Sequence, residues 1–173
     1  MKTIEVRRHS IRNRPGDDLS EQGLLLARLV GAESGPFQCV VTSTLPRAYQ
    51  TAVAMGFKVD AQADLFNTYG DAVEAEIPWP ADFSEYAAPV RRGSGAPSRY
   101  AQRLTEFLTH LAESLPEPGA ALVVTHGGVV EIGAVACLPD ANHNAWGQYV
   151  ECLEGVRLSW QDGKFVAAEI LRV

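Results

Sequence analysis

Short apolar stretches alternate along the chain with longer segments in which apolar residues recur every three or four positions. The first pattern predicts buried strands, and the second predicts amphipathic helices that cover a sheet. The predicted strands are residues 3–9, 38–42, 57–59 and 120–126, followed by a C-terminal set that includes 147–153. The predicted helices begin at Ser20, near Pro46, at Ser98 and at Val129. Strands that alternate with helices indicate an α/β fold, a three-layer sandwich in which helices flank a mostly parallel central sheet.

Local signals mark the ends of several of these elements. Ser20 is a typical N-cap residue, and Gly56 suits the position that follows a helix. Asp162-Gly163 predicts the tight turn of a C-terminal hairpin. Because no internal repeat or second core pattern is present, we expect one domain that spans residues 1–173.

Residues 67–97 interrupt the alternation of strands and helices. Prolines and glycines are frequent there: Pro78, Pro80, Pro89 and Pro97, with Gly70, Gly93 and Gly95. A loop of this length in a compact domain usually serves a functional site. The sequence therefore predicts a lid-like or substrate-binding loop over this range.

Composition excludes several classes of protein. Of the 173 residues, 46% are hydrophobic and 21% are charged, which is typical of a globular protein rather than a disordered one. No apolar run approaches the roughly 20 residues that span a bilayer, so we expect no membrane association. The three cysteines are widely spaced and do not form a disulfide framework, which favours a cytoplasmic protein.

The distribution of charge narrows the choice of ligand. The net charge is −6, which argues against a general nucleic-acid binder. Five of the 15 basic residues nevertheless lie in the first 14 positions: Lys2, Arg7, Arg8, Arg12 and Arg14. A positive region in an acidic protein is better suited to a small anion than to a long polyanion.

Two histidines occupy similar places at the ends of apolar runs. His9 ends the first predicted strand, and His126 ends the strand that precedes Gly127-Gly128. In open α/β sheets, ligands bind outside the carboxyl ends of the strands. Arginines beside His9 can hold the oxygens of a phosphoryl group while a neutral imidazole attacks its phosphorus. Arg47, in the first turn of a predicted helix, is expected at the same edge.

Four motifs in this order resemble the histidine phosphatase superfamily, also called phosphoglycerate mutase-like. They are Arg8-His9-Ser10, the run Leu19-Ser20-Glu21-Gln22-Gly23, the run from Ser43 to Ala52, and Thr125-His126-Gly127. The resemblance implies a transient phosphohistidine on His9, with Arg8, Arg12, Arg47 and His126 binding the phosphoryl group and Gly127 beside it. It also implies a phosphoglycerate mutase-like fold and no metal or other cofactor.

The chain departs from the family pattern at the position of the proton donor. A glutamate that follows a leucine is the acid in the mutase branch, and this chain has Asn67 there. In the acid phosphatase branch the acid directly follows the second histidine, and this chain has Gly127 there. We therefore expect a donor from residues 67–97, with Asp71, Glu74 and Glu76 as candidates. Glu76 is favoured, because Pro78 stiffens an extended stretch in which both glutamates face one side.

The sequence thus predicts a metal-independent phosphatase that acts on a small phosphorylated substrate, with phosphate or sulfate as a ligand of the pocket. Two alternatives stay open. The substrate can be a phosphohistidine on another protein, or the chain can be a non-catalytic phosphate-binding module that has lost its acid.

Overall fold

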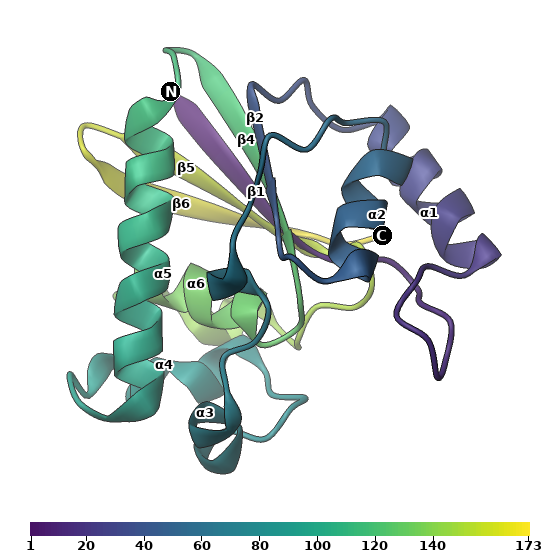
Figure 1. Cartoon of the computed structure of the whole chain (residues 1–173). Helices are drawn as coiled ribbons and strands as arrows, with labels where there is room; N and C mark the ends of the chain where they lie inside the picture. The colour runs from purple at the N-terminus through teal and green to yellow at the C-terminus, as the bar shows by residue number, and fades with distance from the viewer.

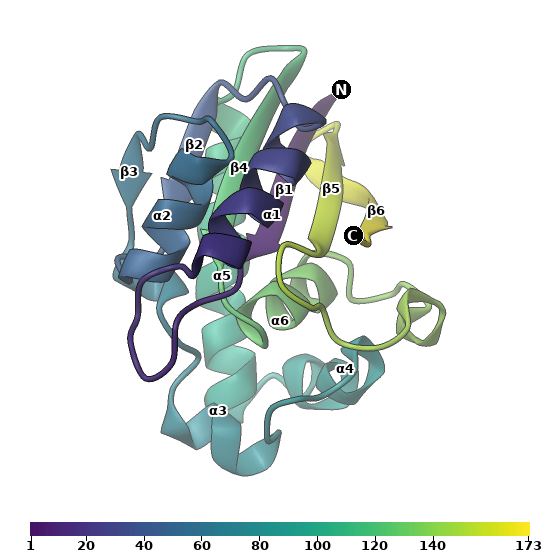
Figure 2. The same ribbon diagram turned by 90° about the vertical axis from the view of Figure 1, so that its right-hand side faces the viewer.

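A single six-stranded sheet forms the centre of the protein in the computed structural model, which describes all residues, 1–173 (Figures 1 and 2). The strands follow the order β3-β2-β4-β1-β5-β6. Their bounds are β1 (Lys2–Arg8), β2 (Cys39–Thr42), β3 (Ala61–Gln62), β4 (Gly119–Thr125), β5 (Gly155–Gln161) and β6 (Lys164–Leu171). The first four in spatial order are parallel, whereas β5 and β6 are antiparallel. The mostly parallel α/β sheet expected from the sequence is confirmed.

Helices cover both faces of this sheet. Their bounds are α1 (Glu21–Ala32), α2 (Pro46–Ala54), α3 (Asp71–Glu76), α4 (Phe83–Arg91), α5 (Gly95–Ser114) and α6 (Val129–Cys137), with 3₁₀ turns η1 (Asp64–Phe66) and η2 (His143–Trp146). Helices α1 and α2 lie on one face, α5 lies on the other, and α3 and α4 extend beyond one end of the sheet (Figures 1 and 2). None of the helices is both long and apolar enough to cross a membrane.

The side chains of the central strand β4 are divided between two hydrophobic clusters, one on each face of the sheet. Leu122 and Val124 belong to the smaller cluster, in which small residues of α1 and α2 such as Ala27 and Ala48 allow close packing. The alternate residue Val123 belongs to the larger cluster, which includes residues of α5 and α6. Because successive side chains of a strand point to opposite faces, a strand buried on both sides is apolar throughout.

Parallel pairing brings three strand ends to one edge of the sheet. Arg8 at the end of β1 pairs with Thr125 at the end of β4, and Thr42 at the end of β2 pairs with Val124. The residues that follow these ends are therefore neighbours, although they are far apart in sequence.

Residues 67–97 differ from the expected irregular loop, because they contain α3, α4 and the start of α5. Helix α4 is held by buried Phe83 and Tyr86, and a capping box between Asp82 and Glu85 closes its first turn. These contacts outweigh the hydrogen bond that Pro89 removes from the helix.

Two predicted strands are also corrected. Pairing with β2 starts at Ala61 rather than at residue 57, because the side chain of Asp60 accepts the Val40 N–H. Residues 147–153 form no strand. The backbone there is engaged by side chains instead: the Val150 N–H donates to Glu131 and its carbonyl accepts from Arg8. The hairpin turn at residues 162–163 is confirmed.

Candidate functional site

His9 directly follows β1 and is held by backbone groups on both sides. Its N–H donates to the carbonyl of Thr125 at 2.8 Å, and its ring Nδ1 lies 2.6 Å from the carbonyl oxygen of Ser10. A carbonyl can only accept, so Nδ1 carries the hydrogen and Nε2 keeps its lone pair. The Ser10 hydroxyl in turn donates to the carbonyl of Gly23. The tautomer of His9 is thus set by a buried turn.

Glycine at position 23 is required by this close packing. A Cβ atom there would lie 2.0 Å from the carbonyl oxygen of Ile11, so a larger residue would push α1 away from the His9 turn. Gly23 belongs to the second sequence motif, which therefore supports the site without lining it.

Burial keeps His9 neutral near pH 7. Desolvation lowers its pKa to about 4, and the positive charges of Arg47, Arg8 and Arg12 act in the same direction. The hydrogen bond to Ser10 opposes this shift but is the weaker influence. A neutral imidazole with a free Nε2 lone pair is the form that attacks phosphorus.

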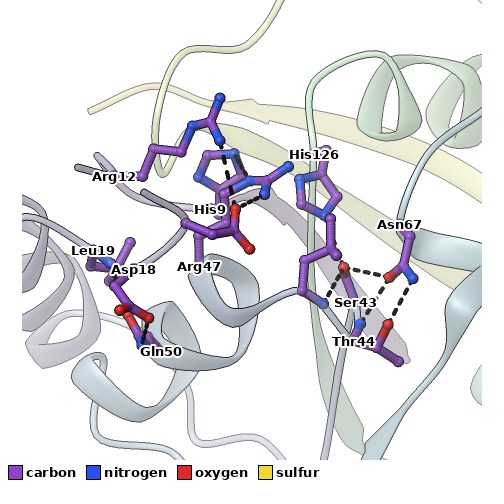
Figure 3. A network of polar contacts seen from close by, with 12 residues as sticks. His9, Arg12, Asp18, Leu19, Ser43, Thr44, Arg47, Gln50, Asn67 and His126 are labelled. Carbon is purple, nitrogen blue, oxygen red and sulfur yellow. Dashed lines mark hydrogen bonds and ion pairs between the residues drawn. The ribbon is translucent and has the colours of Figure 1, made fainter. Parts of the chain in front are cut away.

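A cavity of about 330 Å³ lies in front of His9. Four arginines line it, and no carboxylate does: Arg8, Arg12, Arg14 and Arg47. Arg47 comes from the first turn of α2 and donates its Nε–H to His9 Nε2 at 3.1 Å (Figure 3). Such a set of guanidinium groups matches the oxygens of a phosphoryl dianion.

His126 faces His9, and its tautomer is also defined. The two ring centroids are 5.1 Å apart, and His126 Nε2 lies 2.9 Å from the Ser43 hydroxyl oxygen (Figure 3). That hydroxyl donates to Asn67 Oδ1 at 2.7 Å, and the same oxygen accepts the Thr44 N–H, which identifies it as the amide oxygen. The Ser43 hydrogen is therefore used, so Nε2 of His126 carries its own hydrogen and donates. Nδ1 is left as a buried lone pair without a partner.

The pKa of His126 is lowered to about 2 by burial and by the neighbouring His9 and arginines. A bound dianion would offset the charges of the arginines and raise this pKa. Because Nε2 already carries a hydrogen, Nδ1 is the atom of His126 that would take up a proton if the ring became charged.

A second cavity of about 620 Å³ adjoins the first and has a different character. The two cavities share Arg47, Trp79, His126 and Gly127. Two carboxylates, Asp71 and Glu74, line only the second one. Glu74 accepts the Tyr69 hydroxyl and, at 3.1 Å, the N–H of Trp79.

Trp79 lies at the boundary between the two cavities. A Cβ atom at position 127 would lie 2.2 Å from its indole ring, so only glycine lets this ring rest on the backbone beside His126. The other neighbours of the indole are Arg8, whose guanidinium carbon is 5.2 Å from the ring centroid, and Tyr149, which packs edge to face.

Most of the residues predicted for the site come together in the structure, and one does not. The first cavity is lined by Arg8, His9, Arg12, Arg47, His126 and Gly127. Glu76 lines neither cavity and instead pairs with Arg92 at 2.8 Å on the surface. The reasoning for Glu76 assumed an extended stretch, whereas residues 71–76 form helix α3, in which residues two apart point in different directions.

Sequence reasoning missed three contributions to the site. Ser43 and Asn67 fix the tautomer of His126, and Asp17 forms ion pairs with Arg12 and Arg47. Ser43 directly follows the buried β2 strand, which was a usable signal. No comparable signal marked Asp17, because it stands next to another aspartate in an irregular loop.

No group of three His, Cys, Asp or Glu side chains is placed to hold a metal ion.

The sequence matches the family model of the histidine phosphatase superfamily (branch 1) over residues 3–171. The chain belongs to this superfamily. A search of the curated proteins finds no match.

Solved structures of this superfamily fold cover nearly the whole chain. Phosphoserine phosphatase from Entamoeba histolytica has 15% identity and a TM-score of 0.68, covering 100% of this chain and 98% of its own. Mycobacterial glucosyl-3-phosphoglycerate phosphatase has 22% identity and a TM-score of 0.67, covering 99% and 98%. Phosphoglycerate mutase from Bacillus anthracis has 17% identity and a TM-score of 0.66, covering 95% and 90%. At these identities the likeness shows a shared phosphoglycerate mutase-like fold.

Proposed function

We propose that this histidine phosphatase superfamily member hydrolyses a small phosphomonoester through a phosphohistidine on His9, without a metal ion. The observation that carries the proposal is the neutral His9 ring, which lines a cavity with four arginines and whose Nε2 lone pair accepts a hydrogen bond from one of them, Arg47. The similar folds of a phosphoserine phosphatase and a glucosyl-3-phosphoglycerate phosphatase support a small phosphorylated substrate.

In the first step, His9 Nε2 attacks phosphorus, a P–N bond forms, and the P–O bond to the leaving group breaks. The arginines Arg8, Arg12 and Arg47 hold the non-bridging oxygens and stabilise their charge. His126 Nδ1 contributes a further donor once the bound dianion has raised its pKa. The Ser10 carbonyl stabilises the positive charge that develops on the His9 ring, because it accepts the Nδ1 hydrogen.

The leaving oxygen needs a proton when the product is an alkyl alcohol, and we assign this role to Glu74. It lines the second cavity together with His126 and accepts the N–H of Trp79, whereas Glu76 lies outside. Asp71 lines the same cavity and is the remaining alternative.

In the second step, water attacks phosphorus, the P–N bond breaks, and His9 returns to its neutral form. The carboxylate that protonated the leaving group takes the proton of this water, so the enzyme regains its starting protonation state. Inorganic phosphate is then released from the arginines.

Trapping of the covalent intermediate tests this proposal directly. Protein mixed with an aryl phosphate carrying a labelled phosphoryl group should release phosphate and retain label on His9. The label should be lost in acid and kept in alkali, as expected of phosphohistidine. Label on any other residue, or hydrolysis that survives His9→Ala, would contradict the assignment.

A non-catalytic phosphate-binding module is the second candidate, favoured by the amide of Asn67 at the place of the family's acid. An aryl phosphate separates the two functions, because an aryl leaving group needs little protonation. Binding of orthophosphate without any release of phosphate from the aryl ester would favour the module.

A further inference from the structure

Glu131 is an interior carboxylate to which the proposed mechanism gives no role. Its side chain is fully buried in the first turn of α6, three residues after Gly128. One carboxylate oxygen accepts the Gly128 N–H at 2.7 Å, and the other accepts the Val150 N–H at 2.8 Å. The first bond is a common way to cap a helix. The second bond is not part of a cap, because it joins α6 to a segment 19 residues away in sequence.

Val150 connects Glu131 to an arginine of the first cavity. Its carbonyl oxygen accepts, at 3.0 Å, the hydrogen bond from Arg8 Nη1, which is the only one that this guanidinium group donates within the protein. Arg8 Nε is buried without a partner, and the Glu151 carboxylate is 3.6 Å from Nη1, beyond hydrogen-bond distance. The direction of the guanidinium group therefore depends on where the Val150 backbone lies.

The Val150 backbone has no support from the sheet, because residues 147–153 form no strand. Its neighbours are held independently. The Tyr149 N–H donates to Asp82, and the Leu153 N–H donates to the Arg8 carbonyl. Loss of the bond to Glu131 should therefore move the Val150 peptide without unfolding the segment around it.

The other bond of Glu131 ends in the turn that carries His126. Gly128 comes directly after His126 and Gly127, and both of these residues line the first cavity together with Arg8. A single buried side chain thus joins the turn after β4 to the segment that holds Arg8.

We propose that Glu131 is a positioning residue that fixes the Arg8 guanidinium relative to the His126 turn through the Val150 backbone. This inference rests on the proposed function, in which Arg8 holds a phosphoryl oxygen. A carboxylate suits the task because each of its oxygens accepts one N–H group. A glutamine would present its amide nitrogen, a donor, to one of these two donors.

The two bonds do not depend on the charge of Glu131. Burial raises the pKa of Glu131 to about 7. A protonated carboxyl keeps a lone pair on each oxygen, so both N–H groups retain an acceptor at pH values where His9 is neutral.

The test compares Glu131→Gln with Glu5→Gln, each made in wild-type protein and in Arg8→Ala. Glu5 is the matched control, because it is also a buried carboxylate but its partners, Arg7 and Arg157, line neither cavity. Two quantities are measured at pH 8: the dissociation constant of orthophosphate, and kcat/KM for an aryl and an alkyl phosphate.

Glu131→Gln should weaken orthophosphate binding about tenfold and lower kcat/KM for both esters by a similar factor, because Arg8 loses its position. In Arg8→Ala the same change should have less than about a twofold effect, because the group through which Glu131 acts is absent. Glu5→Gln should leave both quantities within about twofold of wild type, even where it lowers the melting temperature.

Amide hydrogen exchange gives a readout that needs no activity. In Glu131→Gln the Val150 amide should exchange faster than in wild type, while the Leu153 amide should keep its rate. If Glu131→Gln is unfolded at the assay temperature, Glu131→Asp is the second variant, because its shorter side chain cannot reach both N–H groups.

The failures of the two proposals can be told apart. Wild-type protein that binds orthophosphate but does not hydrolyse the aryl phosphate would overturn the proposed function, while binding and exchange still test Glu131. Wild-type protein that does not bind orthophosphate would overturn both proposals. Unchanged affinity in Glu131→Gln, or an equal loss with and without Arg8, would overturn only the positioning role.

Discussion

The two adjoining cavities are built in different ways. The first has four arginines and comes mainly from residues that directly follow strands or begin a helix at the sheet edge, such as His9, Arg47 and His126. The second contains the carboxylates Asp71 and Glu74, and these come from the segment between β3 and α5. The groups proposed to hold the phosphoryl oxygens are thus positioned by the edge of the sheet, whereas the groups proposed for the leaving side belong to a segment beyond it.

This difference predicts two kinds of mutational effect. Changes in the first cavity should slow all phosphomonoesters alike, because every substrate presents the same phosphoryl group. Changes in the second cavity should depend on the leaving group. The experiments below are arranged from the largest expected effect to the smallest.

His9→Ala should lower the turnover of both alkyl and aryl phosphates by roughly 10³-fold or more, because it removes the proposed nucleophile. Phosphate release and covalent labelling are the two measurements. His110→Ala is the matched control, since His110 is an exposed histidine that bonds only to the Glu106 carbonyl in its own helix. Similar losses in both variants would contradict the assignment.

His126→Ala should lower turnover by about 10²-fold, as expected when one donor to transition-state charge is removed. Asn67→Ala should have a smaller effect in the same direction, because it releases the Ser43 hydroxyl and with it the defined tautomer of His126. Measured kcat values on an aryl and an alkyl ester should fall in parallel. An effect confined to the alkyl ester would place His126 on the leaving side.

The value of kcat/KM should decrease only at unusually low pH. Because the pKa of His9 is lowered to about 4, its ring stays neutral and active as the pH falls from 7 to 5. The value of kcat/KM, corrected for the fraction of dianionic substrate, should be constant over this range and decrease as the pH falls through 4. Resonances of the His9 ring should titrate at the same pH. A decrease of kcat/KM centred near pH 6.5 would mean that burial does not lower the pKa of His9.

Glu74→Gln should slow an alkyl phosphate about tenfold and leave an aryl phosphate nearly unchanged, because only the alkyl leaving group needs a proton. Glu76→Gln is the matched control, with its side chain on Arg92 outside both cavities. Equal, minor effects in both variants on both esters would exclude Glu74 and leave Asp71 to be tested in the same way.

A strong chelator should leave the activity unchanged, because arginines already supply positive charge in the first cavity, the proposed phosphoryl site. The rate of aryl phosphate hydrolysis before and after chelation is the measurement, with added magnesium or zinc as the control. Activity that disappears with the chelator and returns with zinc would mean that His9 and His126 bind a metal.

The first cavity could be predicted from the sequence, because its residues follow patterns that have local causes. A buried strand and the turn after it are both readable, and parallel pairing then brings His9 and His126 to one edge. The glycine at position 127 was also predicted, although its contact turned out to be the indole of Trp79.

The second cavity could not be predicted, because its geometry depends on tertiary packing. Prolines and glycines in residues 67–97 indicated a loop, whereas buried side chains such as Phe83 and Tyr86 hold this segment in helices. The preference for Glu76 assumed an extended backbone, whereas the structure has helix α3 there and places Glu76 outside both cavities. Asp17 was missed for a related reason: its partners are set by how a loop folds back over α2.

The position of Trp79 gives the protein an internal optical reporter. Its indole contacts Gly127 and lies beside Arg8, so a ligand held by that arginine changes the surroundings of the ring. The other two tryptophans are packed elsewhere, Trp146 against Phe83 and Trp160 against Phe165. Fluorescence emission that changes on adding orthophosphate can therefore be attributed to one residue, and ligand occupancy becomes measurable without a label or a turnover assay.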